Sequence, residues 1–289
     1  MKIADICRTK QTLSFEIFPP KKDSDLQSID KTLEILSDLK PDFISVTFGA
    51  GGGSNRNRTI ELAKQIKNDY KIEPVVHLTS IHYTKAEIDR FASVMREEGI
   101  ENVLALRGDR TDLIPEKDDF RHASDLVSYL REKYDFCILG ACYPECHPES
   151  DSRISDIAAL KKKVDAGAEV LLSQMFFDNE MFYDFVERTR IADIDVPVIP
   201  GIMPVTKAAQ IRKMVSICHA SFPRRFEKII ERYGDDSDAL FDAGMSYALS
   251  QIIDLLSSDV SGIHLYTMNN PVIAGRICEG IKNIACVRA

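Results

Sequence analysis

Short apolar runs rich in β-branched residues recur along the chain, and segments with the spacing of amphipathic helices separate them. Six of the seven intervals between the starts of successive runs are about 30 residues long, the length of a strand–loop–helix–loop unit. Eight strands alternating with helices predict an α/β fold, a closed parallel (β/α)8 TIM barrel rather than an open sheet. The predicted strands are Thr12–Phe18, Asp42–Phe48, Glu73–Leu78, Asn102–Arg107, Phe136–Tyr143, Glu169–Phe176, Val196–Gly201 and Gly262–Thr267.

The helical segments carry their own start and stop signals. Thr84 and Glu87 form a capping box, and Gly99 ends the helix that follows. The spacing breaks once, between Gly201 and Gly262, where the pattern predicts three helices and hence two extra helical pieces after the seventh strand. These three helices are Thr206–His219, Phe222–Tyr233 and Ser237–Leu256. We find no linker rich in Pro, Gly or Ser, so residues 1–289 are predicted to form a single barrel domain.

Composition narrows the class of protein. Hydrophobic residues make up 44% and charged residues 28%, which is typical of globular proteins. The formal net charge of −8 argues against a nucleic-acid partner. No apolar run reaches the ~18 residues of a membrane span, and the first residues lack the apolar stretch of a secretory signal. Seven cysteines, an odd number, indicate reduced thiols, so we expect a cytoplasmic protein.

In a barrel of this kind the active site lies at the carboxyl ends of the strands, which singles out Glu16 in the first strand. An ionised carboxylate inside a barrel is costly unless it is paired, and apolar surroundings favour the protonated form. A protonated carboxyl group suits general acid catalysis. The alternative is a glutamate that is paired in a salt bridge or faces outward.

Other polar residues at strand ends are weaker candidates. Thr47 precedes a glycine-rich loop that fits neither the dinucleotide-binding nor the Walker pattern, and the alternative is an ordinary flexible loop. His77 lies near the end of the third strand, and Arg107, Gly108 and Asp109 end the fourth. Arg107 and Asp109 could grip a polar heterocycle or a phosphate, or simply form a local ion pair.

Three further segments carry candidate chemistry. The run from Cys142 to Pro148 holds cysteine and histidine, but it lacks the second ligand pair that a zinc site needs, so we expect no metal. The amide of Gln174 in the sixth strand needs partners for both its donor and its acceptor, which a heterocyclic ligand edge or a neighbouring strand could supply. Tyr266 and Asn269 follow at the eighth strand.

Taken together, these segments resemble the methylenetetrahydrofolate reductase family, specifically its bacterial, catalytic-barrel-only members. The matching features occur in the same order along the chain, each at a strand end or just after it. They are SFEIFPPK at 14–21, Thr47 with its glycine loop, the His77 strand, ALRGD at 105–109, YPECHPE at 143–149, KKVDAGAE at 162–169, QMFFD at 174–178, PGIMPVT at 200–206 and HLYTMNN at 264–270.

The resemblance implies a barrel that holds FAD and reduces 5,10-methylenetetrahydrofolate to 5-methyltetrahydrofolate. It implies a ping-pong reaction in which NADH or NADPH passes hydride to the flavin and leaves before the folate binds. Glu16 would then act as the general acid that opens the methylene bridge to an iminium, and Asp109 would sit beside the flavin and the pterin, where its charge favours that cation. Gln174, Gln210 and Tyr266 are the expected substrate-binding residues.

The same matching assigns the FAD-binding positions. They are Thr47, His77, Arg107, Gly108, Asp109, Ala123, Tyr143, His147, Asp156, Lys162 and Lys163. The helical pattern alone would place Asp156, Lys162 and Lys163 on the solvated surface, whereas the resemblance lets the two lysines meet the phosphates of the cofactor. Three positions depart from the family, namely His122, Ala159 and Asn270, the last of which replaces an arginine in a common version.

Several alternatives stay open. Electrons could come from a partner iron–sulphur or zinc-containing subunit instead of NAD(P)H. A lyase or hydrolase could use Glu16 with a metal at His77, Cys146 and His147. The chain could also be a non-enzymatic barrel that serves as an interaction subunit. The family further implies a homo-oligomer.

Overall fold

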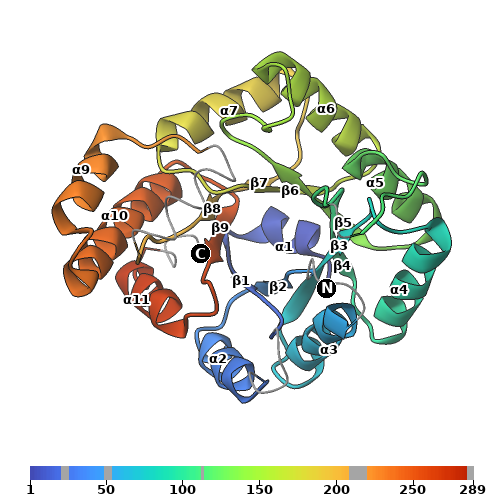
Figure 1. The fold of residues 1–289 in the computed structure, drawn as a ribbon, viewed down its shortest axis with the longest axis horizontal. Helices are drawn as coiled ribbons and strands as arrows, with labels where there is room; N and C mark the ends of the chain where they lie inside the picture. The colour runs from blue at the N-terminus through green and yellow to red at the C-terminus, as the bar shows by residue number, and fades with distance from the viewer. Residues whose placement is uncertain (21–25, 49–53, 112–113, 208–219, 285–289) are drawn as a thin grey trace.

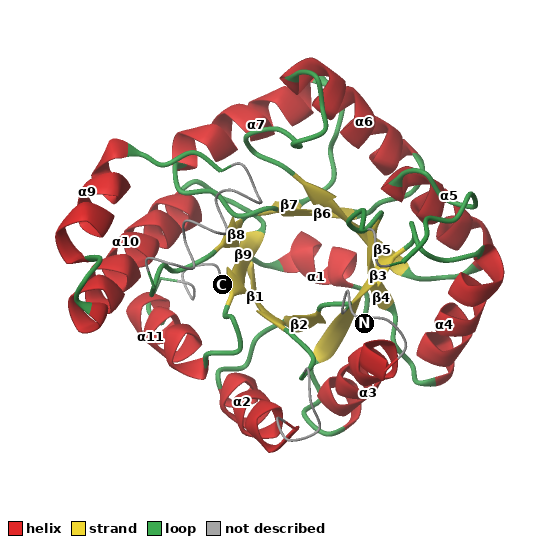
Figure 2. Ribbon diagram, in the orientation of Figure 1, coloured by secondary structure: helices red, strands yellow, loops and turns green. Residues whose placement is uncertain are grey.

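Nine parallel strands form one sheet at the centre of the molecule, and helices surround them (Figures 1 and 2). The computed structural model describes residues 1–20, 26–48, 54–111, 114–207 and 220–284. Neighbouring strands follow the order β7-β6-β5-β4-β3-β2-β1-β9-β8. The strands are β1 Thr12–Ile17, β2 Phe43–Val46, β3 Glu73–Thr79, β4 Asn102–Leu106, β5 Cys137–Cys142, β6 Val170–Ser173, β7 Val198–Ile199, β8 Gly201–Ile202 and β9 Gly262–Tyr266.

The seventh predicted strand is present but broken in two at Pro200, which separates β7 from β8. Its first half pairs with β6 through Leu171 and Val198, and its second half pairs with β9 through Gly201 and His264. Proline has no N–H to donate to a ladder, so the strand changes partner at this point. Because the two halves join opposite ends of the sheet, the structure confirms a (β/α)8 barrel closed through eight strand positions.

Side-chain groups bridge the break. The Gly201 N–H donates to the hydroxyl of Ser173 at 2.9 Å, and the Tyr266 hydroxyl donates to the Ser173 carbonyl at 2.7 Å. These bonds satisfy backbone groups that a regular ladder would have paired.

The helices on the outside follow the predicted alternation. In α4 the capping box of Thr84 and Glu87 is present, and Gly99 just beyond its end has a φ of +70°. After β8 the predicted second and third helices are α9 and α10, whereas the predicted helix at 206–219 lies almost wholly outside the described residues. The outer helices are α2 Leu26–Asp38, α3 Ser54–Asn68, α4 Lys85–Glu97, α5 Ala123–Lys133, α6 Arg153–Asp165, α7 Asn179–Ile191, α9 Arg224–Tyr233, α10 Ser237–Ser257 and α11 Pro271–Ile281.

A short helix that the sequence analysis did not predict, α1 Ile3–Thr9, lies within the ring of strands (Figure 2). Its buried side chains, among them Ile3, pack against Phe43, which opens β2, and against Val75 and Leu104. The Ile3 N–H donates to the side-chain oxygen of Asn102, the first residue of β4, at 2.9 Å. The helix therefore covers the amino end of the barrel.

Alternation along β1 decides which of its side chains face inward. Phe15 and Ile17 are fully buried in the core between strands and helices, together with Leu33 and Leu36 of α2. Successive side chains of a strand point to opposite faces, so Ser14 and Glu16 point into the barrel.

Candidate active site

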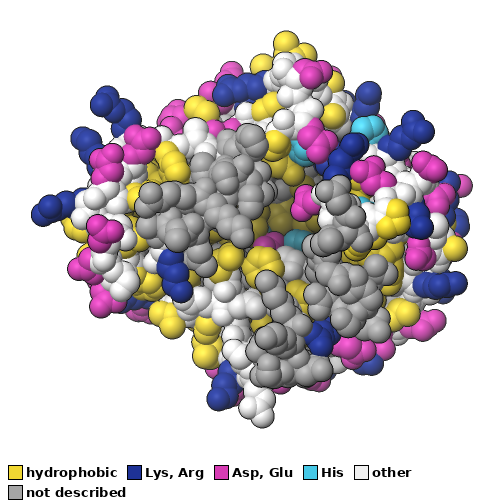
Figure 3. Space-filling view, viewed as in Figure 1, with side chains coloured by type: hydrophobic (Ala, Val, Ile, Leu, Met, Phe, Trp, Pro, Cys, Tyr) yellow, Lys and Arg dark blue, Asp and Glu magenta, His cyan; other side chains and the backbone are white. Residues whose placement is uncertain are grey.

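Glu16 lies inside the barrel, with 9% of its side chain exposed. Its Oε2 is 3.6 Å from Nε2 of His77 on β3 and 3.9 Å from Nε2 of His264 on β9. The Thr267 hydroxyl donates to the Glu16 carbonyl at 2.7 Å and so fixes the backbone at this point. Figure 3 shows a hollow over the centre of the strand ring, with acidic and histidine side chains on its floor. The glutamate is thus neither outward-facing nor joined to a lysine or arginine in any described ion pair.

His77 is buried and electrically neutral near pH 7, because burial lowers its pKa to about 4. Within the described part of the chain, its Nε2 has no hydrogen-bond partner. Buried nitrogens without a partner are rare in native proteins. The orphaned nitrogen therefore marks a place where a bound molecule could supply the missing partner.

His264 is a residue that the sequence reasoning did not single out, although it stands in the quoted segment HLYTMNN. It is fully buried, its Nδ1 lies 2.8 Å from the Ser14 hydroxyl, and its Nε2 lies 3.4 Å from the Ser45 hydroxyl. The signal that could have found it is strand alternation, which places it on the same barrel face as Tyr266.

A cavity of about 300 Å³ lies beyond the ends of β4 and β5, beside α5 and α6. Most of the predicted FAD-binding residues line it, and so do two of the three departures from the family. The lining residues are Arg107, His122, Ala123, Ser124, Ala141, Cys142, Tyr143, His147, Glu149, Ser150, Asp156, Ala159, Leu160, Lys162 and Lys163.

Arg107 forms its ion pair with Glu149 and not with Asp109. Both terminal nitrogens of the guanidinium bind the carboxylate, one of them at 2.6 Å, and Nε donates to the Gly108 carbonyl at 3.1 Å. The hydrogen bond from Arg107 lowers the pKa of Glu149 to about 2. The pair joins the end of β4 to the loop after β5.

His147 lies against the edge of Tyr143, with ring centres 4.6 Å apart. The backbone N–H of Glu149 donates to its Nδ1 at 3.1 Å. Since Nδ1 accepts this bond, the ring proton of neutral His147 must be on Nε2. Burial lowers the pKa of His147, which favours this neutral form.

The helical pattern was wrong about two of the three polar residues on α6. Asp156 is only 7% exposed and accepts a hydrogen bond from the Ser150 hydroxyl at 3.1 Å. Lys163 donates to the Ala141 carbonyl at 2.6 Å, and burial lowers its pKa. Lys162 is exposed, yet it lines the cavity as well.

Thr47, Gly108 and Asp109 follow the ends of β2 and β4 outside the cavity. The Thr47 carbonyl accepts from the Thr59 hydroxyl at 3.0 Å, and the glycine loop at 49–53 lies outside the described residues. Gly108 has a φ of +89°, which a side chain rarely adopts. Asp109 is exposed. Because β1 to β5 are neighbours in order, the predicted cofactor positions form one arc from Glu16 to the cavity.

Two of the predicted substrate residues belong to strands outside this arc, Gln174 just after β6 and Tyr266 in β9. The Gln174 side-chain oxygen accepts from the Met175 N–H at 2.9 Å, and the Tyr266 hydroxyl binds Ser173 as described above. Gln210 lies outside the described residues. Asn269 donates to and accepts from the backbone of Phe18, and Asn270 caps α11.

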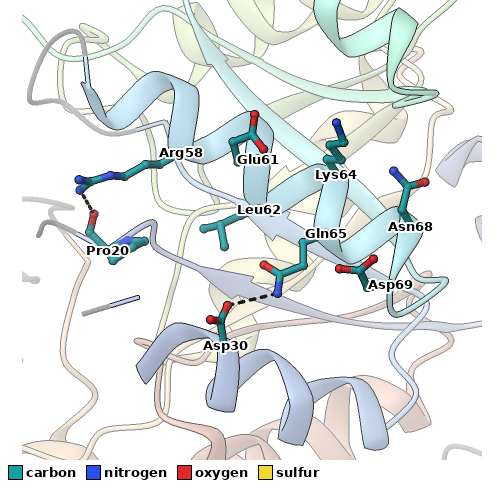
Figure 4. Close-up of a pocket in the computed structure, with 9 residues that line it drawn as sticks. All are labelled: Pro20, Asp30, Arg58, Glu61, Leu62, Lys64, Gln65, Asn68 and Asp69. Carbon is teal, nitrogen blue, oxygen red and sulfur yellow. Dashed lines mark hydrogen bonds between the residues drawn. The ribbon is translucent and has the colours of Figure 1, made fainter. Parts of the chain in front are cut away.

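A second hollow of about 340 Å³ lies between α2 and α3, and apart from Pro20 its lining residues belong to these two helices or directly follow α3 (Figure 4). Gln65 donates to Asp30 across it at 3.2 Å, and Arg58 donates to the Pro20 carbonyl at 2.8 Å. Active sites of such barrels lie at the carboxyl ends of the strands, so we do not assign this surface groove to the site.

The described residues contain no group of three or more His, Cys, Asp or Glu side chains arranged to hold a metal. The metal-dependent lyase or hydrolase that would use His77, Cys146 and His147 therefore has no support from the geometry. No helix in the described ranges is both long and apolar enough to cross a bilayer.

Comparison with solved structures identifies the fold. An uncharacterized protein from Clostridium thermocellum, described as binding two copies of 5-methyl-5,6,7,8-tetrahydrofolic acid, superimposes with a TM-score of 0.67 at 16% identity, over 97% of this chain and 96% of that one. A chain of tryptophan synthase from Mycobacterium tuberculosis superimposes with a TM-score of 0.54 at 14% identity, over 97% of both chains. At such low identity these likenesses show the barrel fold alone.

Comparison of sequences identifies the family. Residues 2–282 match the family described as methylenetetrahydrofolate reductase. The chain is 37% identical over 267 residues to 5,10-methylenetetrahydrofolate reductase of Escherichia coli, covering 92% of this chain and 89% of that protein. It is 34% identical over 284 residues to methylenetetrahydrofolate reductase (NADH) 1 of Arabidopsis thaliana, covering 93% of this chain but only 48% of the plant protein. The chain belongs to the methylenetetrahydrofolate reductase family of oxidoreductases.

Proposed function

We propose that this protein reduces 5,10-methylenetetrahydrofolate to 5-methyltetrahydrofolate, with FAD as cofactor and NADH or NADPH as the electron donor. The observation that carries the proposal is the position of Glu16, buried in the barrel at the start of the arc of residues that ends at the cavity. The likeness to relatives named for this reaction supports it.

The residues of the arc fit a flavin dinucleotide. Arg107, Lys162 and Lys163 bring three cationic side chains to one cavity, which suits an anionic diphosphate. His77 presents a buried nitrogen without a protein partner among the described residues. When bound, FAD would supply hydride transfer between the donor and the folate, in two separate half-reactions. We further propose contacts from Thr47, Gly108, Asp109, Ala123, Tyr143, His147 and Asp156.

Glu16 would act in the folate half-reaction alone. The methylene bridge of the folate must open to an electrophilic iminium before it can accept hydride, and opening requires a proton on the departing nitrogen. Glu16 would donate this proton as the general acid. Two histidines, His77 and His264, lie within 4 Å of its carboxylate.

The remaining polar residues would bind the substrate. The negative charge of Asp109 would stabilise the cationic iminium. Gln174, Gln210 and Tyr266 would contact the folate, with the amide of Gln174 binding the pterin edge. A cytoplasmic location and assembly into a homo-oligomer belong to the same proposal and rest on the family resemblance and the cysteine content.

The test is the colour and the reduction kinetics of the purified protein. We expect a flavin absorbance spectrum, bleaching by NADH or NADPH in anaerobic stopped-flow mixing, and recovery of the spectrum when methylenetetrahydrofolate is added. If only a low-potential carrier reduces the flavin, the electron donor is a partner protein and not NAD(P)H. A yellow protein that neither donor nor methyltetrahydrofolate can reduce would overturn the proposal in favour of an interaction subunit.

A further inference from the structure

One acidic side chain of the cavity, Glu149, contacts two residues that we propose to bind FAD. Its carboxylate binds both terminal nitrogens of Arg107, and its backbone N–H donates to Nδ1 of His147. No predicted site residue other than these two touches it in a described hydrogen bond. It therefore links the end of β4 to the loop that follows β5.

The two side chains of this ion pair differ in their exposure to solvent. The Arg107 side chain is 18% exposed, whereas the Glu149 side chain is 52% exposed. Both side chains line the cavity, and the more exposed carboxylate binds the less exposed guanidinium. A planar guanidinium held by two parallel bonds cannot rotate about its long stem, so its remaining N–H groups keep one direction.

The second contact acts on His147. Because its Nδ1 accepts from the backbone of Glu149, its Nε2 carries the proton. The loop geometry that carries the carboxylate to Arg107 is the same geometry that sets this tautomer.

We propose that Glu149 is a positioning residue for cofactor binding, which orients the Arg107 guanidinium toward an anionic group of the dinucleotide. The inference rests on the proposed function, since it takes FAD as the ligand. In this role Glu149 acts through the Arg107 guanidinium.

The effect of Glu149→Gln on FAD affinity distinguishes an orienting role of Glu149 from a simple effect of its charge. Removing a negative charge from a cavity that binds an anion would tighten binding if charge alone mattered. If orientation matters, loss of the two parallel hydrogen bonds would leave the Arg107 guanidinium free to rotate and would weaken FAD binding. We expect the dissociation constant of FAD for the apoprotein to rise about tenfold, as measured by quenching of flavin fluorescence.

A double-mutant cycle separates orientation from a structural effect on the loop. With Arg107→Ala in place, adding Glu149→Gln should change FAD affinity by less than about twofold, because coupled residues do not act additively. Glu149→Asp, which keeps the charge on a shorter stem, should recover part of the loss. Asp151→Asn is the matched control: it removes a charge from an exposed residue of the same loop and should leave the affinity unchanged.

Three results would overturn the inference: equal or tighter FAD binding by Glu149→Gln, losses that add fully in the double mutant, or an equal loss in Asp151→Asn. If the wild-type apoprotein binds no FAD, the proposed cofactor is wrong. The same cycle is then run with inorganic pyrophosphate as the probe of the Arg107 anion site, so failure of the cofactor and failure of the positioning role are distinguishable.

Discussion

Glu16 is the residue to which we assign the proton donation, and its side chain lies inside the barrel. Its side chain is 9% exposed, it has two histidines as neighbours, and the described ion pairs give it no lysine or arginine. The carboxylate therefore lies beside two imidazole rings, and within the described structure no lysine or arginine occupies the position next to it.

We predict that Glu16→Gln separates the two half-reactions. The variant should bind FAD and be reduced by the donor at the wild-type rate, because the amide keeps the shape of the side chain. Its rate of folate reduction should fall about 10²–10⁴-fold, the usual contribution of a general acid. Anaerobic stopped-flow measurement of each half-reaction checks this, and an equal loss in both would contradict it.

His77 makes stability depend on pH. Its pKa lies at about 4 in the folded protein against an ordinary value of 6.5, because burial disfavours the charged ring. Between these values the unfolded chain binds a proton that the native protein does not, so the free energy of unfolding falls as the pH drops from 6.5 towards 4.

We therefore predict that His77→Gln reduces this fall in the free energy of unfolding at acid pH. Between pH 7 and pH 4.5 the wild type should lose roughly 2–3 kcal/mol more stability than the variant, from the size of the shift. Urea unfolding at a series of pH values measures the difference. The exposed His122→Gln is the control and should follow the wild type; parallel curves for His77→Gln would refute the assignment.

At the scale of elements, the broken seventh strand is the place where the barrel closes. Gly201 sits where a Cβ atom would lie 2.4 Å from the Ser173 carbonyl oxygen and 2.7 Å from the Tyr266 ring. The absence of a side chain lets β8, β6 and the Tyr266 ring approach one another. Closure therefore depends on a glycine next to a proline.

We predict that Gly201→Ala destabilises the fold by about 1–3 kcal/mol, the usual cost of overpacking. Gly275→Ala in α11 is the matched control, since nothing lies within 4 Å of its added Cβ. That change should be neutral or stabilising by up to about 1 kcal/mol. Denaturant unfolding measures the free energy of unfolding of both variants. Equal changes would show that the structure around Gly201 can accommodate a Cβ atom.

At the scale of the whole molecule, the two ends of the barrel differ. Helix α1 packs apolar side chains into the amino end, while Glu16, His77, Arg107 and the cavity belong to the carboxyl half. The packing of α1 therefore closes the amino end of the barrel, opposite the end at which the site lies. The prediction of a single domain over 1–289 remains a prediction.

We predict that Ile3→Ala, which removes a fully buried side chain of α1, costs about 2–5 kcal/mol of stability. Ile154→Ala, at a position 84% exposed on α6, should change stability by less than about 0.5 kcal/mol. Thermal or urea unfolding of the two variants tests whether α1 is part of the core. A small effect at Ile3 would mean that α1 merely rests on the barrel.

The sequence by itself determined the alternation of strands and helices, the caps of α4 and the candidate residues at the strand ends, because these depend on neighbours a few positions away. Only the tertiary structure decided that Pro200 splits the seventh strand between two partners, that α1 fills the amino end, and that Arg107 binds Glu149. It also decided that Asp156 is buried and Lys163 half-buried on a helix whose periodicity places them at the surface. The physical reason is distance along the chain: Arg107 and Glu149 are 42 residues apart, and a contact of that kind exists only once the barrel has closed.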